Sequence, residues 1–231
     1  MFLSWLPENV STFGRDIDGI IALIYYITLA WFIATMGTFA VFLVRYRRRA
    51  GRPAGYIKGD RWREVAWVLL PCLLVLVLDL WIDFKGARVW AKVKIESPAS
   101  DVHIRVTGKQ FNWVVTYPGP DGRFDTADDK TFLDEMHVPA GKPVRLTLEA
   151  KDVIHSFFLP NLRLKQDILP GRSIPAWLDA MKPGQYELPC AHLCGVGHSG
   201  MKATLIVHEA TDWDAWVGEQ WSGSARPGEK T

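Results

Sequence analysis

The segment LPCAHLCGVGHSGM, Leu188 to Met201, concentrates thiol, imidazole and thioether side chains in one short stretch of the chain. Cys190 and Cys194 are four residues apart, His198 follows four residues later, and Met201 follows three after that. Glycines lie between them, where a chain that turns tightly needs residues without a side chain. The spacing therefore predicts one loop folded around a metal.

The types of side chain narrow the choice of metal. Thiolate and thioether ligands favour copper(I), zinc or iron–sulfur clusters, and imidazole suits copper and zinc. Zinc rarely recruits methionine, an iron–sulfur cluster normally takes four cysteines, and a mononuclear blue-copper site uses one cysteine. The second cysteine favours two coppers bridged by two thiolates. A Cys190–Cys194 disulfide is the alternative in an oxidising compartment, but it would give His198 and Met201 no role.

A bridged pair of metals needs a second histidine from elsewhere in the chain. His155, in KDVIHSFFLP, is the best candidate, because an unpaired imidazole in an apolar strand would be costly. His103, His137 and His208 are expected to be surface or hydrogen-bonded structural residues. The expected ligands are His155, Cys190, Cys194, His198 and Met201, with a backbone carbonyl between the two cysteines completing the set.

Two apolar stretches precede this region. Ile20 to Val44 contains no charged residue, and Val65 to Ile82 is interrupted only by Asp79, so both predict helices that cross a hydrocarbon core of about 30 Å. Cys72, in the second stretch, reads as a packing residue. The first nineteen residues lack the pattern of a cleaved signal peptide, and we expect none to be removed.

The segment between the two spans is strongly basic. Its single acid is Asp60, and its basic residues are Arg45, Arg47, Arg48, Arg49, Arg52, Lys58, Arg61 and Arg63. The positive-inside rule places this loop in the cytoplasm and both termini outside. The net charge of +2 over the whole chain gives no reason to expect a nucleic-acid partner.

The chain after residue 83 changes to short alternating runs separated by turns. Apolar residues alternate over 102–106, 144–148 and 203–207, which is typical of an antiparallel sandwich or barrel. Thr211 to Trp221 predicts a closing helix capped by Thr211, followed by a polar tail over 222–231. The expected organisation is an outer segment 1–19, a transmembrane hairpin 20–83 and a mostly β domain 84–231.

KDVIHSFFLPNLRLKQDILPGR, together with the later C-x₃-C-x₃-H-x₂-M pattern, resembles subunit II of cytochrome c oxidase over nearly the whole chain. The resemblance implies a two-helix membrane hairpin followed by a cupredoxin-like Greek-key β-barrel that carries the binuclear copper site Cu-A. It implies that Cys190 and Cys194 bridge two copper ions, that His155 and His198 cap them, that Met201 is a weak axial ligand and that the backbone carbonyl of His192 completes the site.

The resemblance also implies partners and a location. The subunit would accept electrons from cytochrome c and pass them to the haem of subunit I, which reduces oxygen to water with proton translocation; subunit III would complete the core. The location would be a bacterial plasma membrane, with the copper domain on the periplasmic side. Glu64 matches a family position at the mouth of a proton path, and a carboxylate that balances the helix dipole is its alternative. Asp167 and Arg172 match positions facing subunit I, or they form a surface ion pair.

Three features depart from the family pattern. His192 replaces a glutamate that helps to hold magnesium at the subunit I interface, and imidazole is a poor partner for that hard cation, which puts a magnesium site in doubt. Phe111 stands where a tryptophan usually receives electrons, with Trp113 two residues later on the same strand face. The insertion 118–130 has Asp121, Asp125, Asp128 and Asp129 at spacings that could hold calcium, or it is simply an acidic surface loop.

Other functions fit less of the sequence. A quinol oxidase subunit has the same fold but typically lacks the copper ligands, and a soluble nitrous-oxide reductase shares the loop but not the two-span hairpin. A membrane-tethered copper carrier would explain the ligands and the anchor, but not Glu64, Asp167 and Arg172.

Overall fold

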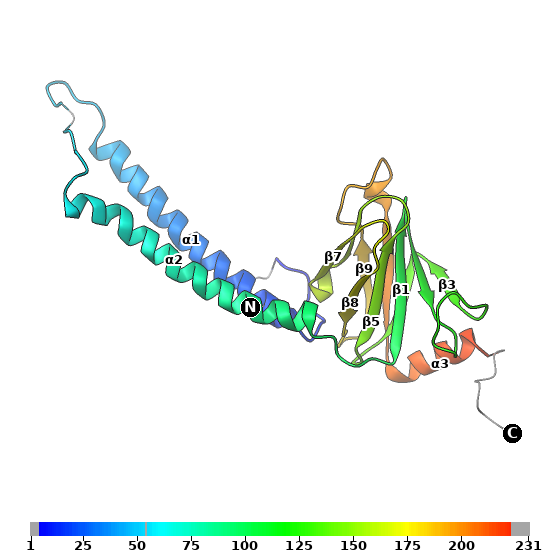
Figure 1. The fold of residues 1–231 in the computed structure, drawn as a ribbon. Coiled ribbons are helices and arrows are strands. Elements are labelled where there is room, and N and C mark those ends of the chain that lie inside the picture. Colours follow the sequence, from blue (N-terminus) through cyan, green and yellow to red (C-terminus); the bar gives the residue numbers. More distant parts are fainter. Residues whose placement is uncertain (1–4, 54, 223–231) are drawn as a thin grey trace. The chain divides into compact units, whose positions relative to one another are not determined.

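The structure is a computed structural model that describes residues 5–53 and 55–222. The described chain forms two compact units, one of residues 18–90 and the other of residues 5–17 together with 91–222 (Figure 1). Most of the polar tail expected over 222–231 lies outside the described residues. Each unit is described by itself below.

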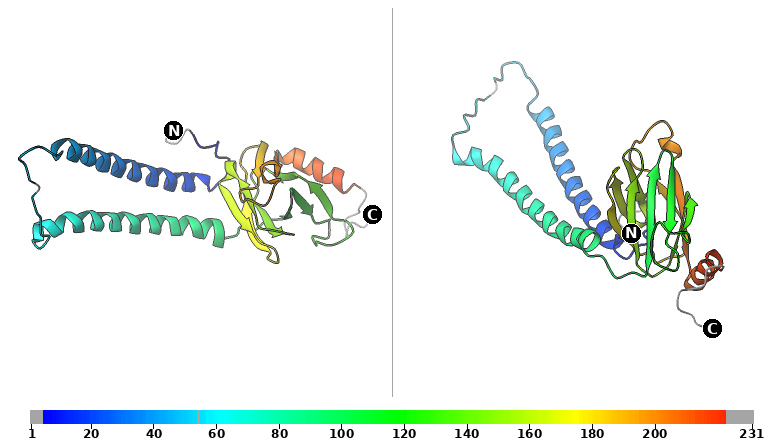
Figure 2. Two further views of the ribbon diagram at one scale, coloured as in Figure 1. Left: turned by 90° about the horizontal axis from the view of Figure 1, so that it is seen from above. Right: turned by 45° about the vertical axis from the view of Figure 1, so that its right-hand side comes forward.

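Two long helices account for the first unit. Helix α1 spans Gly14–Arg45 and helix α2 spans Trp62–Trp90, and they run antiparallel with the basic loop between them (Figure 2). At 1.5 Å per residue, the 32 residues of α1 extend about 48 Å, more than a hydrocarbon core requires. In the most apolar 18-residue stretch of each helix, no residue is buried inside the structure. By length and composition, both predicted spans are therefore candidate membrane helices.

The second unit is built from ten strands. Their bounds are β1 Val102–Lys109, β2 Asn112–Tyr117, β3 Lys130–Leu133, β4 Glu135–Pro139, β5 Val144–Ala150, β6 His155–Leu159, β7 Leu164–Ile168, β8 Ile174–Leu178, β9 Gly184–Pro189 and β10 Lys202–His208. Buried and partly exposed residues alternate along β1, β2, β5 and β10, as the sequence pattern predicts for strands with one face in a core.

These strands form two main sheets and a hairpin. The larger sheet has the order β3-β2-β1-β5-β8, the smaller has the order β4-β10-β9, and β6 pairs with β7. Strands β1 and β5 pair in parallel, with Ile104 opposite Leu146, and β4 and β10 are also parallel. Within the described residues, the ladders of paired strands do not connect one sheet to another. The layers are held together by the side chains that pack between them. The predicted β domain behind a two-helix hairpin is confirmed.

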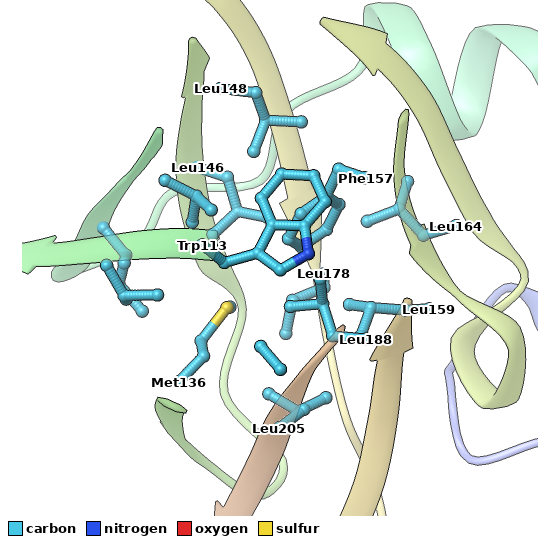
Figure 3. Close-up of a cluster of buried hydrophobic side chains, with 14 of the residues drawn as sticks. Trp113, Met136, Leu146, Leu148, Phe157, Leu159, Leu164, Leu178, Leu188 and Leu205 are labelled. Atoms are coloured by element: carbon cyan, nitrogen blue, oxygen red, sulfur yellow. The ribbon is translucent and has the colours of Figure 1, made fainter. Parts of the chain in front are cut away.

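Trp113 stands at the centre of the core between the layers. Figure 3 shows its indole surrounded by buried apolar side chains of other strands. These are Met136 of β4, Leu146 and Leu148 of β5, Phe157 and Leu159 of β6, Leu164 of β7, Leu178 of β8, Leu188 of β9 and Leu205 of β10. Burial of this many large apolar side chains fixes the packing of the two sheets, and hence the positions of the loops at their ends.

Two further segments complete the β unit. Helix α3, Ala210–Gln220, packs its buried Trp213 on the core; Glu209 is its N-cap, so Thr211 lies inside the first turn and the predicted cap is wrong. At the other end of the chain, Val10 N–H donates to Asn161 O at 2.9 Å, and Phe13 packs edge-on against Trp177. The first residues described thus belong to the β unit.

Candidate metal centre

The loop from Cys190 to Met201 connects β9 to β10 at one end of the β unit. The Cys190 N–H donates to Met201 O at 3.0 Å and closes the base of the loop. An isolated bridge between Phe157 and Cys190 joins this base to β6, the strand that begins at His155. The long-range placement of His155 beside the two cysteines therefore follows from strand pairing.

The predicted donor atoms converge around the two thiols. Cys190 Sγ lies 3.9 Å from Cys194 Sγ, 3.9 Å from His155 Nδ1 and 3.3 Å from the carbonyl oxygen of His192. Cys194 Sγ lies 3.6 Å from His198 Nδ1 and 3.7 Å from Met201 Sδ. Each thiol has one imidazole nitrogen and one weaker donor beside it. Among the described residues, the structure brings together all five predicted side chains and the carbonyl.

These distances leave room for metal ions. A metal bonded to sulfur at about 2.3 Å and to imidazole nitrogen at about 2.0 Å spans donor atoms up to about 4.3 Å apart. The observed thiol–imidazole distances of 3.6 and 3.9 Å fall within that reach. Cys190 and Cys194 are both free thiols, so the alternative disulfide is not formed. The residues fit copper, which thiolate, thioether and imidazole favour.

Most of the donor side chains are buried. His155, Cys190, Cys194 and Met201 are all buried, and His198 is half-buried. Burial, together with the neighbouring Cys190, raises the pKa of the Cys194 thiol to about 11. Since a metal ligand must be a thiolate, binding of a metal releases a proton that the buried thiol otherwise keeps.

Asp152 fixes the orientation of His155, and the sequence reasoning missed it. Its Oδ1 atom lies 2.8 Å from His155 Nε2, and its carboxylate also accepts the amides of Gln110 and Val153, both at 2.7 Å. Burial acts to raise the pKa of Asp152, but these hydrogen bonds outweigh it and hold the pKa below its usual value. A carboxylate on Nε2–H leaves Nδ1 free to face Cys190, which is the arrangement typical of metal-binding histidines.

The neighbouring Gln110 also holds the cysteine loop in place, through a side-chain hydrogen bond. Its side-chain Nε2 donates to Cys194 O at 2.6 Å, while its backbone amide donates to Asp152. One residue in the β1–β2 turn therefore holds both the cysteine loop and the carboxylate behind His155. The only sequence signal was its position beside Phe111.

Phe111 and Trp113 occupy different environments. The ring of Phe111 lies against the cysteine loop so closely that a Cβ added to Gly197 would come within 2.5 Å of it. Trp113 is 0% exposed, with its ring centroid 6.2 Å from that of His155. Phe111 belongs to the turn before β2 and is partly buried, whereas Trp113 belongs to β2 and is buried in the core; a role of either residue in electron entry stays a prediction.

The expected interface residues lie as follows. Asp167 Oδ1 accepts hydrogen bonds from Lys165 and Ser156, which hold the pKa of Asp167 below its usual value. Arg172 is exposed, and the described contacts of Asp167 do not include it. His192 is also exposed. Glu64, in the first unit, lies in the first turn of α2 and accepts the Gly59 amide at 2.8 Å. Both interpretations of Glu64, a proton-path residue and a helix-start carboxylate, stay predictions.

The acidic insertion is held by donors from the chain itself. Arg105 pairs with Asp125 at 2.7 Å, and the Thr126 hydroxyl donates to Asp128 at 2.8 Å and Asp129 at 3.1 Å. Among the described residues, the cluster of potential metal ligands is His155, Cys190 and Cys194, and the insertion forms none. Calcium binding there stays a prediction.

The remaining histidines have protein partners, as expected. His103 Nε2 lies 2.9 Å from Thr147 Oγ1. His137 Nδ1 lies 2.8 Å from His208 Nε2, and both rings stack on Trp216. Burial lowers the pKa of all three histidines. Their role is structural, and they stand apart from the thiol site.

Comparison with known proteins points to one family. Residues 102–210 match the family described as cytochrome c oxidase subunit II, periplasmic domain. The chain is 30% identical to cytochrome c oxidase subunit 2 of Thermostichus vulcanus, covering 91% of this chain and 77% of that one. It is 28% identical to the alternative cytochrome c oxidase subunit 2 of Bradyrhizobium diazoefficiens, covering 95% and 86%. A solved periplasmic domain of subunit II from Bradyrhizobium japonicum is 31% identical over 56% of this chain and 100% of that one, with a TM-score of 0.48.

Proposed function

Because the chain belongs to the cytochrome c oxidase subunit II family, we propose that it is the electron-accepting subunit of a haem–copper terminal oxidase and binds the binuclear Cu-A centre. The observation that carries this proposal is the pair of buried thiols 3.9 Å apart, each beside one imidazole nitrogen. Two copper ions would be held by the thiolates of Cys190 and Cys194 together with the imidazoles of His155 and His198, and Met201 and the carbonyl of His192 would be the weaker ligands.

Bound copper of this kind supplies a one-electron relay in which two metals share the charge. The chain holds the donor atoms in place before any metal binds. His155 lies on strand β6, and a backbone hydrogen bond links Cys190 to Met201 at the base of the loop. Asp152 holds the orientation of the His155 imidazole. Buried, pre-positioned ligands need little rearrangement when the charge changes, and burial excludes water. Oxygen reduction and proton translocation would then take place in subunit I.

The assembly follows from the same proposal. Electrons arrive from cytochrome c or a similar donor beside Phe111 and pass to the haem of subunit I, with subunit III as a further partner. Asp167 and Arg172 face subunit I, and Glu64 stands at a proton path. The basic loop lies in the cytoplasm of a bacterial cell, and the β unit lies on the periplasmic side. No magnesium is proposed at His192.

Purification of the tagged full chain from membranes tests this function against the copper-carrier alternative. If the oxidase proposal is right, a haem-bearing subunit co-purifies with the chain in a fixed ratio. A reduced electron donor then transfers its electrons through this chain to that haem. A full chain that carries copper but comes alone from the membrane, with no haem, would support a tethered carrier and overturn the proposal.

A further inference from the structure

The basic loop that connects α1 to α2 carries a large excess of positive charge. From Arg45, the last residue of α1, to Glu64, in the first turn of α2, the chain has eight basic and two acidic residues, a formal charge of +6. Both acids are counted as charged: Asp60 pairs with Lys58 at 2.8 Å, and Glu64 keeps its charge although it accepts the Gly59 amide. The excess therefore remains after every acid of the loop is included.

The basic residues of this loop are nearly all arginine. The loop has seven arginines and one lysine, whereas the rest of the sequence has eight arginines and eleven lysines. The positive-inside rule needs only a positive charge, which either residue supplies. A guanidinium group presents a planar set of donors that can bind two phosphate oxygens at once, whereas a lysine ammonium acts as a point charge. The composition therefore favours a phosphate ligand in addition to a role in topology.

The arginines lie beside the two helix ends and are unpaired. All seven side chains are exposed, and none of them forms an ion pair within the described residues. Arg47 to Arg49 follow the end of α1 directly, and the Arg52 N–H donates to Arg49 O at 3.3 Å, which turns the chain back. Arg61 precedes α2, and Arg63 lies in its first turn. In a chain that crosses a membrane, these positions lie at the level of the lipid headgroups.

Large apolar side chains lie between these cations and are also exposed. The exposed fractions are 65% for Tyr46, 90% for Tyr56, 74% for Ile57 and 74% for Trp62. Aromatic residues at the ends of membrane spans typically lie among the headgroups, and basic segments with interleaved apolar residues bind at the surface of anionic membranes. The exposed apolar residues therefore fit a lipid surface better than they fit bulk water.

We infer that the basic loop is a binding site for anionic phospholipids of the cytoplasmic leaflet. The inference rests on the topology of the function proposed above and adds a ligand to it. Guanidinium groups from both ends of the loop bind the phosphate oxygens, as clustered basic residues next to a membrane span do. Tyr56 and Ile57 enter the boundary between the headgroups and the acyl chains.

The test measures lipid binding to the full chain, purified in detergent and freed of lipid. The chain is titrated with phosphatidylglycerol or with the uncharged phosphatidylcholine, and native mass spectrometry gives the fraction of chain with lipid bound. Joint substitution of Arg47→Gln, Arg48→Gln, Arg49→Gln and Arg52→Gln should weaken phosphatidylglycerol binding by about fivefold or more. The other four basic residues of the loop stay in place, so the loop remains positive in the variant.

Two further variants show whether the arginine side chains themselves are required. Changing the same four arginines to lysine keeps the charge and should still weaken phosphatidylglycerol binding, though less than glutamine does. Arg145→Gln, which removes an exposed arginine of the β unit, is the control and should leave lipid binding unchanged. If the lysine variant binds as tightly as the wild type, the loop attracts anions by charge alone and the arginine site is excluded.

Other results would also overturn the inference. Equal binding of the two lipids by the wild type, or equal phosphatidylglycerol binding by the wild type and the glutamine variant, would exclude the site. Displacement of the lipid by inorganic phosphate, but not by chloride at the same ionic strength, would assign the site to the free anion. If the glutamine variant differs from the wild type as an isolated chain but not in the purified oxidase, another subunit covers the loop.

Copper content and electron transfer separate this inference from the proposed function. A full chain that holds copper and passes electrons to a haem-bearing subunit, but does not select phosphatidylglycerol, would overturn the lipid site and leave the relay function in place. A chain that selects phosphatidylglycerol but binds no copper would overturn the relay function and leave the lipid site in place.

Discussion

His155 Nε2 lies 2.8 Å from Asp152 Oδ1, so the buried imidazole is held from behind by a carboxylate while its Nδ1 atom faces Cys190. The same carboxylate accepts the Gln110 amide, next to Phe111. Asp152 therefore contributes both to the geometry of the thiol site and to that of the turn that carries Phe111.

Replacing Asp152 by alanine should weaken copper binding. The His155 ring would lose the acceptor that fixes its tautomer and orientation, and loss of such a partner typically costs about 10–100-fold in metal affinity. Competition with a chelator of known affinity on the full chain in detergent measures the change. Asp121→Ala, in the distant insertion, is the control. Unchanged affinity in Asp152→Ala would show that packing alone orients the ring.

Gly197→Ala should displace the Phe111 ring. The added Cβ would lie 2.5 Å from the ring, whereas a Cβ on Gly200, in the same loop, would meet nothing within 4 Å. We expect Gly197→Ala to slow electron transfer from the donor and Gly200→Ala to leave it unchanged, as stopped-flow mixing with reduced donor would show. Equal rates in the two variants would argue against close contact between ring and loop.

Phe111→Ala and Trp113→Ala should have different effects. Phe111→Ala removes a partly buried ring beside the cysteine loop and should slow the arrival of electrons, with a smaller loss of stability than Trp113→Ala. Trp113→Ala empties the centre of the core and should lower the free energy of unfolding by about 3–5 kcal/mol. Rapid kinetics and thermal unfolding of each variant measure the two effects. If electrons arrive equally fast in both variants, Phe111 does not contact the electron donor.

The β unit should lose stability as the pH falls from 7 to 5. Burial holds the pKa values of His103, His137 and His208 below the ordinary value of about 6.5, so the unfolded chain binds more protons in this range. The stability that depends on neutral rings is present above the ordinary pKa and is lost as the pH falls through the folded values. Denaturant unfolding at several pH values measures this slope. His208→Asn should flatten it, and greater stability at pH 5 than at pH 7 would contradict the assignment.

The predicted ligand side chains within 190–201 lie together because they share one short loop, whereas His155 reaches them through the pairing of distant segments. Cysteine, histidine and methionine at fixed short spacings restrict the metal whatever the fold, and alternation located β1, β5 and β10. The place of Trp113 at the centre of the core was not predicted, because the side chains around it come from distant strands. Asp152 and the pairing of Val10 with Asn161 depend on contacts between distant segments, which no local pattern reveals.

The central claim is that Cys190 and Cys194 hold two coppers as one electronic unit. Copper analysis and electron paramagnetic resonance of the full chain, purified in detergent and loaded with copper, test it directly. We predict two coppers per chain and a hyperfine pattern in which one unpaired electron is shared equally by both nuclei. One copper with a localised signal, or a Cys190–Cys194 disulfide and no copper, would contradict the claim.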